Sequence, residues 1–336
     1  MQSSQLKRRK FLTVLGGAAA AWPLGARAQQ GERVRRVGVL MSYLDNDLEA
    51  QAWVAAFYQG LQKLGWVEGH NIHSDSRWAR GEDTEALQKF ARELVALDPH
   101  VILSSSTPST AALVQETRSI PIVFAVVADP VGSGFVANFD RPGGNVTGFT
   151  NHEPTMAGKW LELLKEIAPR VRRAALLYNP ATAPYFEQFL GPFKTAAASL
   201  GVEAIASPVH DRSDLELAIA ALTRVPNGGL VVMTDSYMAA QRAEVMSLAL
   251  RYRLPLVSPY RAYVELGGLL SYGASPLDNY RRASIYADRI LKGIKPSELP
   301  VQVPVQFQLV VNAKTARALG LELPSSFYWR ADEVIE

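Results

Sequence analysis

The chain has 336 residues, enough for two domains, and its 48% apolar and 20% charged residues are typical of a globular protein. It contains no cysteine, which excludes disulfide bonds, cysteine-bound zinc and thiol catalysis. Five of the 35 basic residues lie in residues 1–28, which contain no acidic residue. The rest of the chain therefore has 30 basic and 32 acidic residues. This nearly balanced charge gives no support for binding to nucleic acid or a membrane surface.

Residues 1–28 are typical of a cleavable export signal. A basic cluster, Lys7–Lys10, precedes a weakly apolar run that ends near Leu24, and Ala26-Arg27-Ala28 fits the small-x-small cleavage pattern. The pair Arg8-Arg9 before Phe11-Leu12 indicates a twin-arginine signal. The run is shorter than the roughly 20 residues that span a membrane. We therefore predict a periplasmic protein that is released by cleavage after Ala28, the alternative being a basic anchor that is never cleaved.

From residue 35 onward, short apolar runs alternate with segments of helical periodicity. The runs predict strands at 36–41, 71–78, 101–103, 120–127, 145–150, 173–178, 202–206, 229–233, 254–258, 269–272 and 305–311. A helix is expected in most of the intervals between them. Repeated alternation predicts parallel sheets covered by helices on both faces. Because the series starts again after about residue 150, we predict two similar α/β lobes joined by short crossings.

The turn from Ser104 to Pro108 combines four hydroxyl side chains with a proline. We expect Val101 to Leu103 to be a buried strand, Thr107 to cap the next helix, and Pro108 to open it. A helix start offers free N–H groups and a partial positive charge, so this turn can hold a carboxylate or another anion. The alternative is an ordinary capped turn.

Similar small polar residues follow the other predicted strands, where α/β sheets bind their ligands. Asp235 can hold an ammonium group, and tyrosines such as Tyr260 can form flat walls. The candidate ligand-binding residues are Ser42, Tyr43, Ser105, Ser106, Thr107, Asp129, Asn151, Asp235, Ser236, Tyr237 and Tyr272. The alternative for each is turn chemistry, or core packing for the tyrosines. Together they favour a small polar ligand that carries a carboxylate.

No motif points to catalysis or to a cofactor. The histidines are scattered without a ligand set for a metal, and His152 alone follows a strand. The glycines form neither a dinucleotide fingerprint nor a phosphate-binding loop, and there is no Gly-x-Ser-x-Gly elbow. We therefore predict no catalytic residue, no metal site and no cofactor.

Several segments resemble one bacterial family. They include the signal, Gly65–Gly69 (GWVEG), Asp129–Gly134 (DPVGSG), Arg141–Gly148 (RPGGNVTG) and Ala331–Ile335 (ADEVI). The chain resembles the ABC transporter substrate-binding proteins of the tryptophan and tyrosine type. That resemblance implies a type I periplasmic-binding-protein fold, in which two Rossmann-like lobes joined by three crossings close on a ligand. The implied lobes are residues 31–150 with 274–295, and 151–273 with 298–336.

The resemblance also implies a function without catalysis. We predict a monomeric periplasmic protein that binds a small polar ligand, such as an aromatic amino acid, and delivers it to an ABC transporter permease. A ligand sensor that presents the same closure to a receptor is one alternative. An enzyme that uses the same cleft is another.

Overall fold

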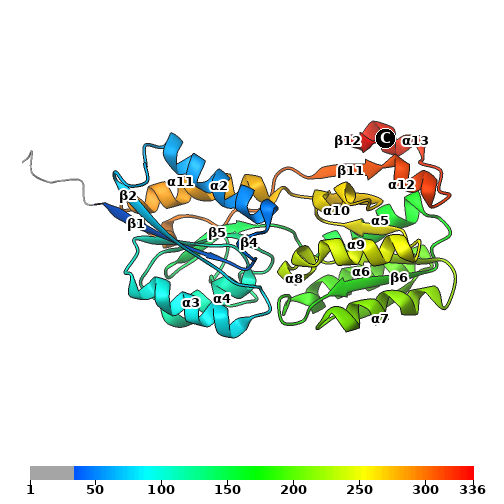
Figure 1. Ribbon diagram of the computed structural model, residues 1–336, viewed down its shortest axis with the longest axis horizontal. Helices are drawn as coiled ribbons and strands as arrows, with labels where there is room; N and C mark the ends of the chain where they lie inside the picture. Colours follow the sequence, from blue (N-terminus) through cyan, green and yellow to red (C-terminus); the bar gives the residue numbers. More distant parts are fainter. Residues whose placement is uncertain (1–33) are drawn as a thin grey trace, which may run out of the picture.

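The computed structural model describes residues 34–336, which form two α/β lobes side by side (Figure 1). The predicted signal peptide lies outside the described residues. Within the described part of the chain, no helix combines the length and the apolar character needed to cross a membrane.

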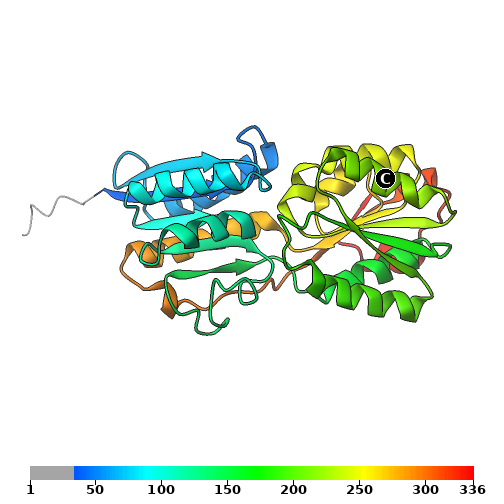
Figure 2. The ribbon, with the colours of Figure 1, turned by 90° about the horizontal axis from the view of Figure 1, so that it is seen from below.

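The first lobe is built on a five-stranded parallel sheet with the strand order β2-β1-β3-β4-β5. Its strands are β1 (Arg35–Met41), β2 (Ile72–Trp78), β3 (Val101–Ser104), β4 (Ile122–Val127) and β5 (Val146–Thr150). Helices cover both faces, which is why β3 and β4 are buried along their whole length (Figures 1 and 2). One face carries α2 (Leu48–Lys63) and α11 (Pro276–Leu291), and the other carries α3 (Thr84–Ala96) and α4 (Thr107–Glu116).

The second lobe holds a seven-stranded sheet with the order β12-β11-β10-β9-β8-β6-β7. Its strands are β6 (Arg173–Tyr178), β7 (Glu203–Pro208), β8 (Gly228–Val232), β9 (Leu256–Ser258), β10 (Leu270–Gly273), β11 (Gln308–Asn312) and β12 (Glu333–Ile335). Its longer helices are α5 (Met156–Ile167), α6 (Phe186–Leu200), α7 (Arg212–Thr223) and α9 (Arg242–Arg251). Helices α5 and α6 pack together on one face of the sheet, and α7 and α9 cover the other (Figure 2).

The chain passes between the lobes three times: after β5, between β10 and α11, and between the short helix η1 (Pro296–Glu298) and β11. The crossings are tied together, because Thr150 N donates to Gln302 O at 2.9 Å and Asn279 Nδ2 donates to Thr150 O at 2.9 Å. The prediction of two parallel-sheet lobes joined by three crossings is confirmed.

Three details differ from the sequence-based expectation. Strand β11 runs antiparallel to β10, because the chain returns to the second lobe along an extended crossing and not through a helix on the face of the sheet. Helix α4 begins one residue early, with extended Ser106 as its N-cap and Thr107 as its first residue. Four helices of five or six residues were not expected, since they are too short to show periodicity: α8 (Ser236–Ala240), α10 (Arg261–Glu265), α12 (Ala313–Ala318) and α13 (Ser325–Arg330).

One glycine is essential to the first sheet. Gly148 lies in β5 with φ of +154°, and a Cβ there would come within 2.1 Å of Phe124 O in β4. Only glycine fits so close to the neighbouring backbone. The tight contact stands beside the register shift between β4 and β5, just before β5 leads into the first crossing.

Candidate functional site

The carboxyl ends of the parallel strands of both sheets point into the cleft between the lobes, and a small cavity lies there. Its volume of about 10 Å³ gives room for about one water molecule. Both lobes contribute to its lining, which consists of Tyr43, Ser106, Thr107, Pro108, Val126, Asn151, Thr182, Tyr185, Thr234, Asp235, Ser236 and Tyr260. In this conformation the lobes are therefore closed on each other.

The turn before α4 forms the first-lobe wall, and most of its hydroxyls are used within the lobe. Ser105 Oγ accepts from Ser42 N at 2.8 Å, and Ser106 Oγ donates to Ser42 Oγ at 2.7 Å. Ser104 Oγ lies 2.8 Å from the hydroxyl of Thr110. Thr107 Oγ1 is different, because among residues 34–336 it is buried without a hydrogen-bond partner, although it lies close enough to the Tyr185 hydroxyl to lower the pKa of that group. Of the four hydroxyls in the described turn, that of Thr107 is therefore the one best placed to bind a ligand.

Asp235 and Ser236, at the start of α8, form the opposite wall. Asp235 Oδ1 accepts from Met238 N at 2.7 Å and Thr182 Oγ1 at 3.1 Å, while Oδ2 accepts from Asn179 N at 3.1 Å. Burial raises the pKa of Asp235 to about 7, although these three hydrogen bonds lower it. The carboxyl therefore changes charge near neutral pH inside the cleft. Ser236 Oγ is buried without a partner among the described residues, as Thr107 Oγ1 is on the other lobe.

A hydrogen-bonded group of aromatic and polar side chains closes the cavity. Tyr260 Oη lies 2.8 Å from Thr234 Oγ1, and Asn151 Nδ2 donates to Thr234 Oγ1 at 2.5 Å. Tyr185 Oη donates to Thr234 O at 2.7 Å. Burial raises the pKa of Tyr185 and of Tyr260 well above that of free tyrosine. These rings therefore serve as neutral, semi-polar walls.

His152, at the first crossing, has its ring buried behind this wall. Its Nε2 accepts from Ala274 N at 3.3 Å, so Nδ1 carries the proton, and Nδ1 has no partner within the described part of the chain. Burial lowers the pKa of His152 to about 3. The ring is therefore neutral and ties the first crossing to the second, which is a structural role at the hinge.

Two polar contacts join the lobes beside the cavity. Arg242, from α9, binds Asp47, the N-cap of α2, through two hydrogen bonds of 2.9 and 3.1 Å, and its Nε lies 3.7 Å from Glu49. Gln188, from α6, donates to Asp129 at the end of β4. Both contacts require the closed arrangement, because their partners belong to different lobes.

The structure brings six of the eleven predicted site residues to the cavity: Tyr43, Ser106, Thr107, Asn151, Asp235 and Ser236. The other five lie elsewhere. Ser42 and Ser105 support the first-lobe wall from behind, and Asp129 faces Gln188 at the side of the cleft. Tyr237 is packed in the core, and Tyr272 lies against Phe307 near the hinge.

Thr182, Tyr185 and Thr234 also line the cavity but were not singled out from the sequence. Thr234 directly follows the residues predicted as a strand, so its position at a strand end was a usable signal. Thr182 and Tyr185 lie further along the loop after β6, and no sequence pattern shows which residues of that loop fold back toward the cavity.

Comparison with known proteins gives one family and several relatives. The family described as ABC transporter substrate binding protein matches residues 43–335. A tyrosine-binding protein of Clostridioides difficile (strain R20291) is 26% identical over 280 residues, which cover 82% of this chain and 80% of that protein. Solved ABC transporter solute-binding proteins at lower identity share the fold alone.

Two solved structures of similar proteins differ in whether a ligand is bound. An ABC domain from Streptococcus pneumonia in complex with L-Trp is 26% identical, with a TM-score of 0.81, and 90% of this chain and 99% of that one are covered. The ligand-free, open structure of a substrate binding protein with adhesive properties from Clostridium difficile has the same identity and coverage but a TM-score of 0.66. The lobe arrangement described above is therefore nearer to that of the complex.

Proposed function

The chain belongs to the family of ABC transporter substrate-binding proteins, and from that premise we propose that its ligand is an L-amino acid with an aromatic side chain. The single observation that carries the proposal is the pairing of opposite chemistries across the cavity. The start of α4 with Thr107 lies on one lobe, and the Asp235 carboxyl lies on the other. An α-amino acid carries a carboxylate and an ammonium group on one carbon, which matches this pairing.

The carboxylate end is assigned to the first lobe. Thr107 Oγ1 supplies a free hydroxyl, and α4 begins beside it with the partial positive charge of a helix start. Thr107→Val is expected to weaken binding by about 10- to 150-fold, because a buried hydrogen bond to a charged group contributes about 1.5–3 kcal/mol.

The ammonium end is assigned to Asp235. Its two oxygens accept three hydrogen bonds from the protein, so a further donor can share the second lone pair of Oδ2. An ammonium group beside Asp235 would also hold its pKa down and keep the carboxyl ionised. The side chain of the ligand would lie against Tyr43, Tyr185 and Tyr260, which offer stacking surfaces, and the lobes would have to stand further apart than here to admit it, because the present cavity of about 10 Å³ has room for only about one water molecule.

The remaining parts of the proposal follow from the family. The protein is exported by residues 1–28, works in the periplasm, and presents its closed form to an ABC permease without catalysing a reaction on the ligand. The alternation of open and closed forms is driven by the higher affinity of the closed form for the ligand.

Titration calorimetry with a matched ligand series tests the proposal. L-tryptophan, L-tyrosine and L-phenylalanine are compared with tryptamine, which lacks the carboxylate, and with indole-3-propionate, which lacks the ammonium group. We expect tight binding of at least one amino acid and a loss of more than tenfold for each truncated analogue. Equal binding of an amino acid and both analogues, or binding of a sugar in their place, would refute the assignment.

A further inference from the structure

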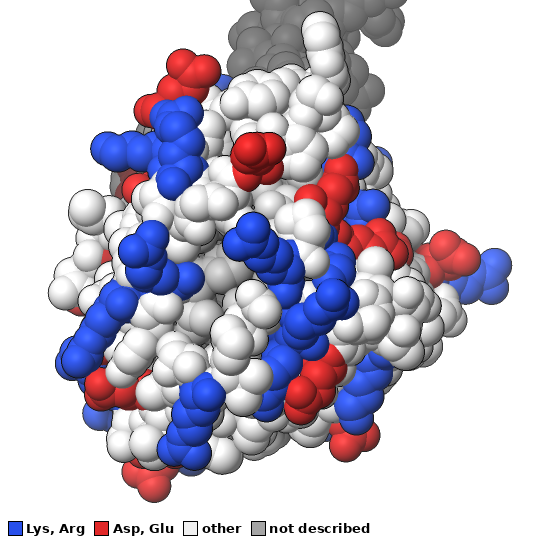
Figure 3. All heavy atoms as spheres, turned by 90° about the vertical axis from the view of Figure 1, so that its right-hand side faces the viewer, with Lys and Arg blue, Asp and Glu red and all other residues white. Residues whose placement is uncertain are grey.

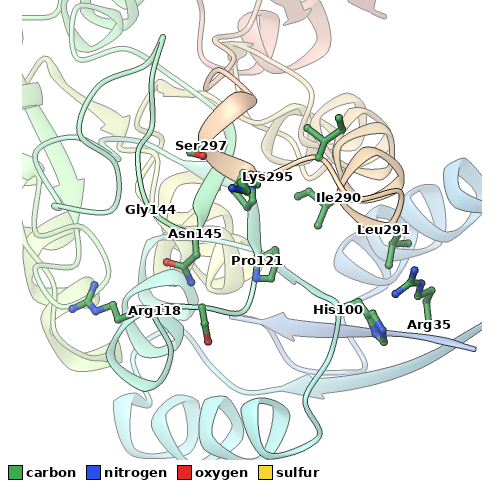
Figure 4. A pocket seen from close by; sticks show the side chains of 14 residues that line it. Arg35, His100, Arg118, Pro121, Gly144, Asn145, Ile290, Leu291, Lys295 and Ser297 are labelled. Carbon is green, nitrogen blue, oxygen red and sulfur yellow. The ribbon is translucent and has the colours of Figure 1, made fainter. Parts of the chain in front are cut away.

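A second cavity lies at the outer end of the first lobe, away from the cleft (Figure 4). Its volume is about 470 Å³, within the range of small-molecule pockets. Arg35, the first residue of β1, and the segments that precede β3, β4 and β5 form one side, and the last turn of α11 with the segment up to Ser297 forms the other. These are the amino ends of the strands, so the pocket is separate from the interlobe site.

The charged residues that line this pocket are all basic. They are Arg35, Arg118 and Lys295, and no Asp or Glu of residues 34–336 is part of the lining. Among residues 34–336, none of the three is joined to a carboxylate within 4 Å, whereas the neighbouring Arg36 pairs with Asp75 at 3.5 Å. Three cationic groups therefore share one cavity without compensating charges in its wall.

His100 adds a neutral donor to this set, and it lies near Arg35 in Figure 4. Its Nδ1 accepts from Arg36 N at 3.1 Å, so the proton is on Nε2. Burial and the nearby Arg35 lower the pKa of His100, although Asp98 raises it. The ring is therefore a hydrogen-bond donor without a charge of its own.

The last turn of α11 supplies an apolar wall. Ile290 and Leu291 line the pocket but are only 7% and 3% exposed, so Ile294, which is 41% exposed, supplies most of the apolar surface. A helix end normally disfavours anions, but here two of the last carbonyls are occupied, because Gly293 N donates to Ile290 O and Ile294 N donates to Arg289 O. The pocket thus joins unpaired cations to an apolar surface.

We propose that this pocket binds a small amphipathic anion, a carboxylate or phosphate group on an apolar tail. Zwitterionic amino acids fit it poorly, because their ammonium group would face three cations and no carboxylate. The head group can come from a free acid or from an anionic phospholipid, since both present the same chemistry. This inference does not depend on the proposed function of the cleft.

The test uses the exported protein and two kinds of probe. Titration calorimetry measures binding of octanoate and hexyl phosphate, with hexylammonium as the oppositely charged comparison. Flotation with vesicles that contain phosphatidylglycerol tests the lipid source, with phosphatidylcholine vesicles as the comparison. We expect one of the two anionic sources to bind and both comparison probes to fail.

Variants then assign the binding to this pocket. Lys295→Gln and Arg118→Gln change exposed side chains and should each weaken binding about tenfold without changing the thermal midpoint. Arg224→Gln is the matched control, because Arg224 is exposed on the second lobe, whose outer end carries Lys and Arg mixed with Asp and Glu (Figure 3). Its effect should stay within twofold.

Binding of free acids alone or of anionic vesicles alone would support the proposal and identify the source. No binding of either probe would overturn it. Binding that both pocket variants leave unchanged, or that Arg224→Gln weakens equally, would also overturn it.

Discussion

The contact between Arg242 and Asp47 should control how tightly the protein holds its ligand. The guanidinium group of Arg242 makes two hydrogen bonds to the Asp47 carboxylate, at 2.9 and 3.1 Å, and joins the second lobe to the first. Burial alone would raise the pKa of Asp47, but the bonds from Arg242 and from backbone N–H groups hold it below its usual value. The ion pair is therefore intact at neutral pH in the closed form and is broken when the lobes separate.

The geometry sets the size of the effect. The side chains of Arg242 and Asp47 are 20% and 13% exposed, so water screens the pair only in part. An exposed ion pair contributes about 0.2–1 kcal/mol, and charge-assisted bidentate pairs are roughly twice as strong as neutral hydrogen bonds. We therefore assign the pair about 1–2 kcal/mol in the closed form, which corresponds to a factor of about 5–30 in the closing equilibrium.

Arg242→Met is the suitable substitution, because it keeps an apolar stem and removes the charge. Replacing Asp47 would be less informative, since Asp47 Oδ1 also caps α2 through Glu49 N and Ala50 N. We expect the dissociation constant of the cleft ligand to rise about 5- to 30-fold, mainly through faster dissociation. Calorimetry gives the affinity, stopped-flow fluorescence gives the rates, and small-angle scattering with saturating ligand verifies closure.

The control is Arg251→Met, which removes a pair within the second lobe, to Glu216 at 3.5 Å with both side chains more than half exposed. It should change neither affinity nor rates. High salt should narrow the difference between wild type and Arg242→Met, because the pair is partly screened. If Arg242→Met leaves the dissociation constant within twofold of wild type while the thermal midpoint falls, the pair stabilises the fold and not the closed state, and the reasoning is wrong.

Three further predictions concern single positions. Burial raises the pKa of Asp235 to about 7, so the folded chain holds a proton that the unfolded chain releases near pH 4. The free energy of unfolding should therefore fall as the pH rises from about 4 to 7. Asp235→Asn should flatten this slope in urea titrations. Gly81→Val should hinder closure of the lobes, since a Cβ at Gly81 would lie 2.3 Å from Ser236 Oγ across the cleft. Small-angle scattering should show a larger radius of gyration for this variant than for wild type with ligand present, and an unchanged radius would contradict the prediction. Gly148→Ala should cost about 3 kcal/mol in urea unfolding, because of the clash with Phe124 O, and a cost below 1 kcal/mol would disprove that reading.

The fold could be predicted from the sequence because each lobe repeats a simple pattern. A buried parallel strand is a short run of apolar residues, and β4 (IVFAVV) and β6 (RAALLY) show it without interruption. Strand ends follow from the same runs, so residues such as Thr107 and Asp235 could be nominated for the cleft. The antiparallel β11 could not be identified, because strand direction leaves no mark on such a short run.

The contacts between the lobes could not be predicted from the sequence. Arg242 and Asp47 are 195 positions apart, and neither stands out in its own segment: one begins a helix, and the other is an ordinary N-cap. The hydroxyls of the Ser104–Pro108 turn also look alike in the sequence. Only the packing shows that Ser105 and Ser106 are satisfied by Ser42 and that Thr107 is not.

The unpartnered hydroxyls explain why closure should depend on a ligand. Thr107 Oγ1 and Ser236 Oγ come from opposite lobes, and both are buried in the closed form without a partner in the part of the chain that the structure describes. Each such group destabilises the closed form by about 1–3 kcal/mol relative to its hydrated state, which is comparable to the stabilisation that the Arg242–Asp47 pair contributes. A cavity of about 10 Å³ admits about one water molecule, so closure without ligand recovers only part of that cost. A ligand of the proposed kind, with a carboxylate and an ammonium group, would supply partners on both walls at once, and we expect this difference between the two closed forms to make the lobes close on a ligand and reopen without one.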